Sequence, residues 1–296
     1  MTETVDSKEF YAKYHGHSVS HLKTLFKHFK SKNKNFIFLV GDSSLDNKFW
    51  ISSKDCKVLS EFESILHPPF MKPDVAYHLN SLLCERFVAL NCAVEESTVE
   101  ERNRSTWIHP QDQFVSEHIG SEDMLIVSIA GNDVALKPSA KTMWYMGLMF
   151  SMNSLEMIRK GPSMAWGMSH FIDLFKNQIE SYILKLIPKD LAKRPKKILV
   201  CMIYYPLMTA GAQNGWAKST LDMLGYFKQP TLLQEAIQQL FIHATSQISI
   251  PGSKVIPVPL YESLDGKDVR DYVALVEPSN SGGRKMAEQL ISHLMK

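Results

Sequence analysis

The sequence of 296 residues has few cysteines and almost no excess of charge. Its four cysteines, Cys56, Cys84, Cys92 and Cys201, form no CxxC pair, which argues against a disulfide scaffold and favours a reducing compartment. The last three lie in apolar stretches, where a free cysteine is expected to be buried. The net charge of +2 gives no reason to expect nucleic acid or an anionic membrane as a partner.

Long apolar runs are absent as well. The nearest candidate, residues 143–158, contains Ser151, Asn153, Ser154 and Glu156, so no membrane span is predicted. The first nine residues carry acidic charges and no apolar core, so no signal peptide is expected. From these features we predict a soluble, cytoplasmic protein.

No spacing typical of a metal or nucleotide site is present. No His or Cys pair is followed by a matching second pair, and there is no GxxxxGK[ST] phosphate loop. The segment 211–215, Gly-Ala-Gln-Asn-Gly, is interpreted as a loop. The basic stretch Lys23–Lys34 is interpreted as the solvated face of a helix. No cofactor and no metal are predicted.

The sequence alternates between short apolar runs and helical patterns. Five runs are hydrophobic almost throughout, at residues 36–40, 87–92, 124–129, 198–205 and 255–260. Such runs are typical of strands that helices cover on both faces. Helical periodicity marks three further segments, at residues 171–187, 232–242 and 282–296.

This alternation predicts an α/β fold, a three-layer α/β/α sandwich around a mostly parallel five-stranded sheet. No repeat, low-complexity tract or long linker divides the chain. We therefore interpret residues 1–33 as an N-terminal helical extension and residues 34–296 as a single α/β domain.

Polar turns follow the first three predicted strands. Asp42 and Ser43 come after the first strand, segment 91–98 after the second, and Asn132 and Asp133 after the third. In parallel α/β sheets the active crevice lies at these strand ends. A serine there, followed by a helix, presents its hydroxyl near amides that favour negative charge, and an asparagine can donate to an oxyanion. The same residues also suit a helix N-cap and ordinary turns, so both interpretations stay open.

These turns resemble the first three sequence blocks of the SGNH (GDSL-type) hydrolases. The matching motifs are Gly-Asp-Ser at 41–43, Asn-x-Ala-Val-x-x-Ser-Thr at 91–98 and Gly-Asn-Asp at 131–133. Segment 277–287 is similar to the last block, which leads into the terminal helix. The resemblance begins at Phe36 and runs to the end of the sequence. It implies an SGNH-hydrolase or flavodoxin-like sheet and a serine hydrolase that cleaves esters, thioesters or acetyl groups through an acyl-enzyme.

The resemblance also implies roles for particular residues. Ser43 would be the nucleophile, and its amide, an amide of the second turn and the Asn132 side chain would form the oxyanion hole. The residues expected to line this site or the oxyanion hole are Asp42, Glu96, Gly131 and Asp133.

The sequence departs from the family pattern in the second, third and last blocks. Glu96 stands where the family has Gly, and a carboxylate there opposes an oxyanion. Ala130 replaces the first Gly of the third block. The last block lacks its Asp-x-x-His, because the aligned positions hold Ala274 and Glu277. Glu277, with Asp271 as a displaced partner, therefore occupies the acid/base position, although a carboxyl of unperturbed pKa about 4.3 is a weak base toward serine.

Two other features bear on the site. His67, His109, His118 and His170 follow no strand end, so surface or helix-face roles are expected for them. Segment 143–168 holds seven methionines, Trp144, Phe150 and Trp166. It predicts either an apolar wall or lid over the crevice or a helical insertion packed into the core.

Two hypotheses about function follow from the sequence. The first is an SGNH-like serine esterase or lipase that hydrolyses a small ester or acyl substrate. The second is a catalytically impaired protein of the same fold that binds a small molecule without turning it over. They differ in whether Glu277 can replace the missing histidine. The sequence favours no particular oligomeric state.

Overall fold

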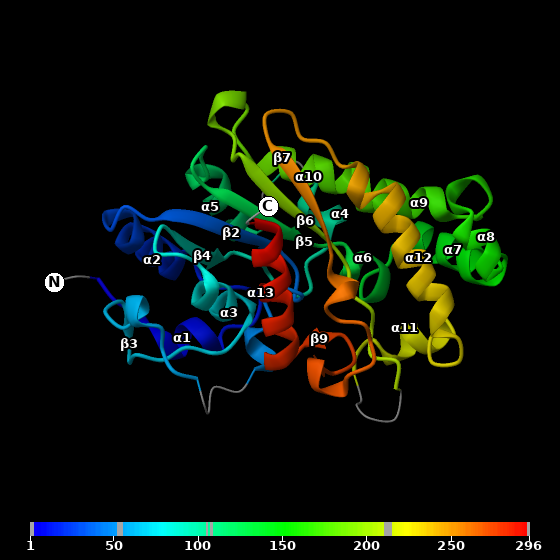
Figure 1. Cartoon of the computed structure of the whole chain (residues 1–296), viewed down its shortest axis with the longest axis horizontal. Coiled ribbons are helices and arrows are strands. Elements are labelled where there is room, and N and C mark those ends of the chain that lie inside the picture. The colour runs from blue at the N-terminus through cyan, green and yellow to red at the C-terminus, as the bar shows by residue number, and fades with distance from the viewer. Residues whose placement is uncertain (1–2, 52–55, 105, 107–108, 210–214, 295–296) are drawn as a thin grey trace.

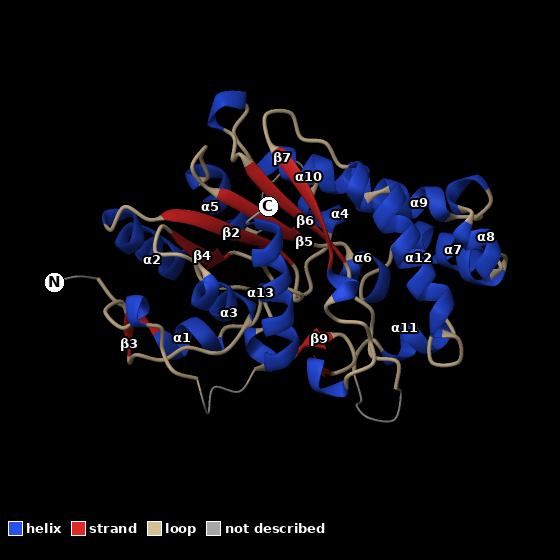
Figure 2. Cartoon of the chain, viewed as in Figure 1, coloured by secondary structure: helices blue, strands red, loops and turns tan. Residues whose placement is uncertain are grey.

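The computed structural model describes residues 3–51, 56–104, 106, 109–209 and 215–294. Most of the predicted loop at 211–215 lies outside these ranges. The central sheet consists of β2 (Asn35–Gly41), β4 (Phe87–Asn91), β5 (Met124–Ser128), β6 (Lys197–Met202) and β7 (Lys254–Pro259). All neighbouring strands are parallel, in the order β4-β2-β5-β6-β7 (Figure 2). The mostly parallel five-stranded sheet predicted from the sequence is therefore confirmed.

Short helices and strand pairs surround this sheet. The helices are α1 (Ser7–Ala12), α2 (Val19–Ser31), α3 (Val75–Leu82), α4 (Val99–Arg102), α5 (Pro110–His118), α6 (Gly131–Ala135), α7 (Ala140–Ser151), α8 (Leu155–Arg159), α9 (Met168–Ile172), α10 (Ile179–Leu186), α11 (Lys218–Met223), α12 (Pro230–His243) and α13 (Asn280–Leu294). The two-residue strands are β1 (Val5–Asp6), β3 (Leu66–His67), β8 (Tyr272–Val273) and β9 (Glu277–Pro278).

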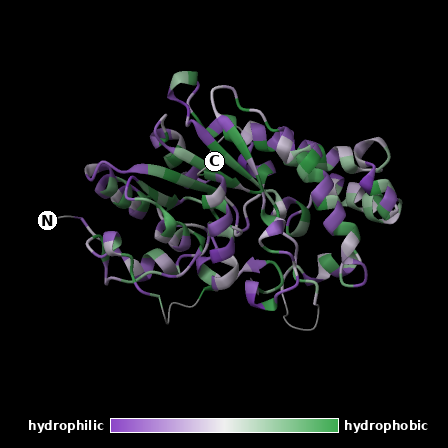
Figure 3. Cartoon of the chain, viewed as in Figure 1, coloured by the Kyte–Doolittle hydropathy of each residue, from purple (hydrophilic) through white to green (hydrophobic). Residues whose placement is uncertain are grey.

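The two faces of the sheet are buried in separate hydrophobic clusters. Along β2, Phe36, Phe38 and Val40 belong to one cluster, while Ile37 and Leu39 belong to the other. This alternation follows from the period of two in a strand, and it explains why the run reads as continuously apolar (Figure 3). Helices α2, α5, α10 and α12 contribute to the first cluster, and α3 and α13 to the second (Figure 1). The result is the three-layer sandwich expected from the sequence.

Residues 3–33 are largely helical. Strand β1 pairs in parallel with β3, and Leu22, Leu25 and Phe29 of α2 belong to the same buried cluster as Phe36 of β2. Lys23, Lys27 and Lys30 are exposed, as expected for the solvated face of a helix. The domain boundary at residue 33 stays a prediction.

The methionine-rich segment forms α7, α8 and α9, which lie together beyond one end of the sheet (Figure 1). Met146, Met149 and Met168 are buried in the first cluster, whereas Trp144 and Trp166 are exposed. Met143, Met152 and Met164 are exposed as well, so only part of the segment packs into the core. The three buried methionines favour the packed insertion over the lid.

The structure corrects several details of the sequence interpretation. Cys84 is exposed rather than buried, because it lies in the turn after α3, although all four cysteines are unpaired. Strand β6 ends at Met202 and does not reach residue 205. The single helix expected over 171–187 contains a π-helical segment, Asp173–Gln178, between α9 and α10. Among the described residues, no helix combines the length and the apolarity needed to cross a membrane.

Candidate active site

The candidate site lies at the point where the strand order reverses. After β2 the chain adds β4 on one side, and it then returns to add β5 on the other. The loops that leave β2 and β5 therefore diverge and open a crevice between them at the carboxyl ends of the strands. Ser43 lies two residues beyond β2, and Gly131 three residues beyond β5, so the first and third turns meet as predicted.

Gly41 allows β2 and β5 to approach closely at this edge. Its φ is +137°, and an added Cβ would lie 1.7 Å from the carbonyl oxygen of Ser128 on β5. The next amide, that of Asp42, donates to the same oxygen at 3.0 Å. No other residue type fits this position without moving a strand.

Gly41→Ala is therefore expected to destabilise the protein by about 3 kcal/mol or more, because both the backbone conformation and the space are unsuitable. Chemical denaturation would measure the loss, with Gly147→Ala as the control, since nothing lies within 4 Å of a Cβ added there. An equal effect of the two substitutions would contradict the close approach described here.

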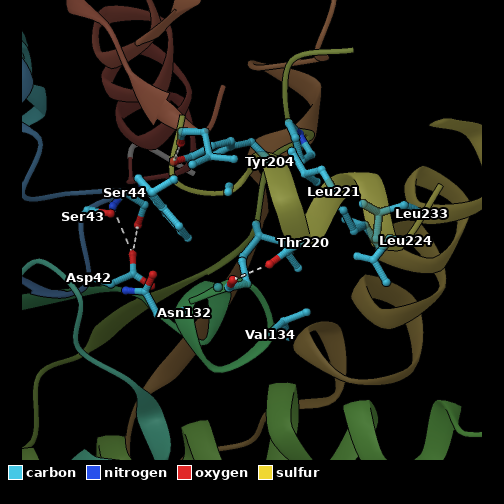
Figure 4. Close-up of a pocket in the computed structure, with 18 residues that line it drawn as sticks. Asp42, Ser43, Ser44, Asn132, Val134, Tyr204, Thr220, Leu221, Leu224 and Leu233 are labelled. Carbon is cyan, nitrogen blue, oxygen red and sulfur yellow. Dashed lines mark hydrogen bonds between the residues drawn. The ribbon is translucent and has the colours of Figure 1, made fainter. Parts of the chain in front are cut away.

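The turn that presents Ser43 is shorter than expected. The Asp42 carbonyl accepts the amides of Leu45 and Asp46, both at 3.1 Å, but no α-helix follows. The Asp42 carboxylate accepts the Ser44 amide at 3.0 Å and the Ser44 hydroxyl at 2.7 Å (Figure 4). A hydrogen bond between a side chain and a nearby backbone amide, as here, favours a turn over a helix. The helix dipole expected to favour negative charge at Ser43 is therefore missing.

Glu277 lies beside Ser43, although 234 positions separate them in the sequence. The Ser43 hydroxyl donates to Glu277 Oε1 at 3.4 Å, and the Trp216 indole N–H donates to the same oxygen at 3.0 Å. Strand β9, which carries Glu277, is held by antiparallel pairing with β8. Within the described residues, the buried Oε2 atom of Glu277 has no hydrogen-bond partner.

Burial sets the protonation of this carboxyl. It raises the pKa of Glu277 to about 7, against the lowering effect of the hydrogen bonds from Trp216 and Ser43. The negative charges of Asp42 and Glu95 raise the same pKa further. Glu277 is thus a carboxyl whose basicity approaches that of a histidine.

Asn132 connects the third turn with the second. Its side-chain nitrogen donates to the Ser97 carbonyl at 3.1 Å, and Asn132 also borders the pocket beside Ser43. A side-chain amide has two N–H groups, so one remains for a ligand. Within the described residues, the Ser43 amide donates to no protein acceptor. Both groups can therefore donate to an oxyanion.

The two positions where the family pattern has Gly keep the backbone that favours glycine. Glu96 has φ +59° and Ala130 has φ +86°. The Glu96 carboxylate accepts the Tyr14 hydroxyl at 3.0 Å and lies 3.4 Å from the Lys137 ammonium. The repulsion expected between this carboxylate and an oxyanion is thus offset by a neighbouring cation.

Two of the acidic residues singled out from the sequence have other partners. Asp133 accepts the amides of Val99 and Glu100 at 2.9 and 3.1 Å, so it caps α4. Burial raises the pKa of Asp133 to about 6 despite these hydrogen bonds. Asp271 is buried against α13, where it accepts from the Lys285 ammonium at 2.6 Å. Among the described contacts, nothing joins Asp271 to Ser43 or Glu277, so its expected role as partner of Glu277 is not supported.

The histidines lie elsewhere, as expected. His109 pairs with Glu101 at 2.8 Å, His118 bonds to its own helix, and His170 contacts Thr142 at 3.1 Å. His67 is exposed in β3. In the part of the chain that the structure describes, none of them contacts Ser43 or Glu277, and no cluster of His, Cys, Asp or Glu is arranged to hold a metal ion.

A pocket of about 110 Å³ opens beside Ser43. Figure 4 shows Asp42, Ser43 and Asn132 at one end of it and leucines of α11 and α12 at the other. The lining residues are Asp42, Ser43, Ser44, Gly131, Asn132, Val134, Ala135, Ile203, Tyr204, Pro206, Trp216, Ala217, Thr220, Leu221, Leu224, Leu233, Ile237 and Val276. No methionine of segment 143–168 is among them.

The sequence interpretation missed the walls of this pocket. Trp216 and the helices α11 and α12 supply part of them, with Thr220 and Leu221 from α11 and two further residues from α12. The Thr220 hydroxyl anchors α11 to the Ala135 carbonyl at 3.0 Å. The only signal was the helical periodicity over 232–242, which predicted a helix but not the face it presents to the crevice.

No family model matches the chain, and no curated protein sequence matches it either. Similar solved structures include the lipase Lip_vut3 from a goat rumen metagenome (TM-score 0.49, 13% identity, 88% of this chain and 97% of that chain). Others are the carbohydrate acetylesterase Est24 from Sinorhizobium meliloti (0.45, 9%, 88% and 99%) and the aryl esterase of M. smegmatis (0.43, 13%, 88% and 99%). The similarity concerns the fold, and at these values none of their substrates or residue roles is transferred to this chain.

Proposed function

We propose that this chain is a serine ester hydrolase of the SGNH type with a Ser43–Glu277 pair in place of the usual serine and histidine. The observation that carries the proposal is the contact between the Ser43 hydroxyl and Glu277 Oε1 at the polar end of an apolar pocket. Nucleophile, base and oxyanion donors there come from three separate segments of the chain, the turns after β2 and β5 and the strand β9. The four unpaired cysteines support a reducing, cytoplasmic location for this enzyme.

The reaction would run in two acyl-transfer steps. Ionised Glu277 takes the Ser43 proton as Oγ attacks the ester carbonyl carbon, and the Ser43 amide and Asn132 side chain donate to the resulting oxyanion. Collapse breaks the bond to the alkoxy group, which leaves as the alcohol with the proton from Glu277. Water then loses a proton to Glu277, attacks the acyl-enzyme and releases the carboxylic acid, while Ser43 regains its proton.

The pocket favours a short acyl or small aryl group. Leu224, Leu233 and Ile237 are among the residues that line the pocket, so an acyl or aryl group that enters beside Ser43 would meet apolar side chains. A dry cavity of about 150 Å³ is known to hold benzene. The pocket beside Ser43, at about 110 Å³, is therefore of a size for a group no larger than a small ring. Acetyl esters and small aromatic esters are therefore the substrates to try first.

Labelling with a fluorophosphonate tests the proposal directly. We expect stoichiometric modification of Ser43 and hydrolysis of p-nitrophenyl acetate, both abolished in Ser43→Ala. Ser163→Ala is the matched control, because Ser163 is exposed on a distant turn and bonds only to the Lys160 carbonyl in the described contacts. Absence of both labelling and hydrolysis in the unmodified protein would refute the proposal.

The second candidate is a binding protein without turnover. It is favoured by the length of the Ser43–Glu277 contact, 3.4 Å, and by the missing partner for Glu277 Oε2, since an oriented base normally has one. Glu277→His separates the two. If the variant gains hydrolysis that the unmodified protein lacks, the natural site is a disabled triad; if it loses existing hydrolysis, Glu277 is a working base.

A further inference from the structure

The second turn of the site, residues 94–97, is held by a segment near the N-terminus. The Tyr14 hydroxyl donates to Glu96 Oε1 at 3.0 Å across 82 positions of sequence. The Gly16 amide donates to Glu95 Oε2 at 2.8 Å, and His15 Nδ1 lies 3.4 Å from the Glu95 carbonyl oxygen. Two consecutive residues of the turn are thus bound by three consecutive residues of another chain segment.

The fit between the two segments is tight. Gly16 has φ +83°, and an added Cβ would lie 3.0 Å from Val94 Cγ2 and 3.1 Å from the Ala93 carbonyl oxygen. On its other carboxylate oxygen Glu95 is bound by the buried Lys48 ammonium at 3.3 Å. The turn therefore has little room to move on either side.

The same turn is bonded to the groups that surround Ser43. The Val94 amide donates to the Gly41 carbonyl at 2.9 Å, and the Ser97 hydroxyl donates to the same carbonyl at 3.1 Å. The Ser97 carbonyl in turn accepts from the Asn132 side chain at 3.1 Å. A shift of the turn would displace both the strand end before Ser43 and the side chain that donates to the oxyanion.

The backbone of the turn also needs external support. Glu96 is not glycine, yet its φ is +59°, a conformation that costs a residue with a side chain roughly 1–2 kcal/mol. Strained backbone of this kind persists only where neighbouring contacts hold it. Among the described contacts, the side chains of Tyr14 and Lys137 bind the Glu96 carboxylate.

We propose that Tyr14–Gly16 is a positioning segment that holds turn 94–97 in the geometry needed for oxyanion binding, an inference that rests on the proposed ester hydrolysis. Residues 14–16 belong to the stretch interpreted from the sequence as an extension outside the catalytic domain. In this proposal they are a working part of the site. They act through the turn and do not touch the substrate.

Tyr14→Phe tests the proposal, because it removes one hydroxyl and leaves the ring packed on Phe49. We expect kcat for p-nitrophenyl acetate to fall about tenfold, a fraction of the loss seen when an oxyanion donor is deleted, with KM changed less than twofold. Amide hydrogen exchange in residues 94–97 should accelerate at least tenfold, while the melting temperature stays within 2 °C or so. Tyr77→Phe is the matched control, since the Tyr77 hydroxyl also donates to a protein oxygen, the Lys57 carbonyl, at 2.8 Å.

A double-variant cycle with Glu96→Gly adds a second readout. Glycine restores the favoured residue at positive φ and removes the acceptor of the Tyr14 hydroxyl, so adding Tyr14→Phe should then cost nothing further in kcat. A full additional tenfold loss would overturn the proposal, because Tyr14 would then act by another route. Unchanged exchange at 94–97 in an active Tyr14→Phe variant would overturn it as well. If the unmodified protein hydrolyses no ester, the proposed function fails, and accelerated exchange would still support the segment's hold on the turn.

Discussion

Replacing Glu277 by glutamine is expected to lower kcat by a factor of about 10²–10⁴, the range that a general base contributes. Glutamine keeps the shape and still accepts the Trp216 indole N–H, but it cannot take the Ser43 proton. The measurement is the steady-state hydrolysis of p-nitrophenyl acetate, with active-site concentration fixed by fluorophosphonate titration. Glu156→Gln is the control, because that carboxylate is exposed on α8. A kcat within twofold of the unmodified protein would exclude Glu277 as the base.

The pH dependence of hydrolysis gives an independent test of the same residue. Only ionised Glu277 can accept a proton, and burial raises the pKa of this carboxyl to about 7. We therefore expect kcat/KM to fall tenfold per pH unit below about 7 and to be constant above it. A profile that stays flat down to pH 5 would contradict a base with this pKa.

Stability should depend on pH in the opposite direction. Between about pH 4.5 and 7, folded Glu277 binds more protons than the unfolded chain does, so the free energy of unfolding falls as pH rises through this window. The full shift in the pKa of Glu277 corresponds to a change of about 3 kcal/mol at most in the free energy of unfolding. Above pH 7, Glu277→Gln should accordingly be more stable than the unmodified protein while it is less active. Stability and catalysis thus compete at one carboxyl.

Arg102→Met should cause the largest loss of stability, about 3–5 kcal/mol, because it leaves buried partners without their cation. The Arg102 guanidinium is buried; it pairs with Asp112 and donates to Tyr182 Oη at 2.8 Å and to the Gly41 carbonyl at 2.7 Å. It also donates to the Ser97 hydroxyl at 2.9 Å. The substitution keeps much of the volume and removes every one of these hydrogen bonds. Urea denaturation at pH 7 would measure the change.

The double substitution Arg102→Met with Asp112→Leu distinguishes an unpaired charge from lost packing. Removing both charges should recover most of the stability, since a buried ion pair replaced by apolar side chains is often neutral. Arg102→Lys keeps the charge but cannot reach four acceptors. Its free energy of unfolding should therefore lie between those of Arg102→Met and the double variant. If the double variant were as unstable as Arg102→Met alone, the unpaired Asp112 would not be the cause. An unchanged urea midpoint in Arg102→Met would contradict the network itself.

The fold could be predicted well from the sequence because both faces of the inner strands of the central sheet are buried. Runs such as 36–40 and 124–129 stand out when nearly every residue is apolar, and the wide spacing between them requires crossover helices. Strand ends were less clear. The run that begins at residue 198 stays apolar beyond Met202, where the chain turns to line the pocket, and composition does not distinguish a buried strand from a buried loop.

The candidate site was predictable only where local motifs carry it. The turns at Ser43 and Asn132 follow strands, so their meeting at one edge follows from the parallel sheet. The partner of Asp271 was not predictable, because Lys285 is adjacent to Arg284 on a helix whose rotation depends on packing. The contacts of Tyr14 and Trp216 with the site's carboxylates also escaped notice, since nothing local distinguishes them from other aromatic residues.

The distance in sequence between Ser43 and Glu277 has a consequence for refolding. The strand β2 that carries Ser43 can pair with β4 and β5 while the last fifth of the chain is still unfolded, but Glu277 arrives only with β9 and α13. Contacts across 234 positions form slowly, because the chain loses the entropy of closing a long loop before the contact contributes any stabilisation. Recovered hydrolysis should therefore lag behind recovered circular dichroism, which makes catalysis the stricter assay of a correctly renatured preparation.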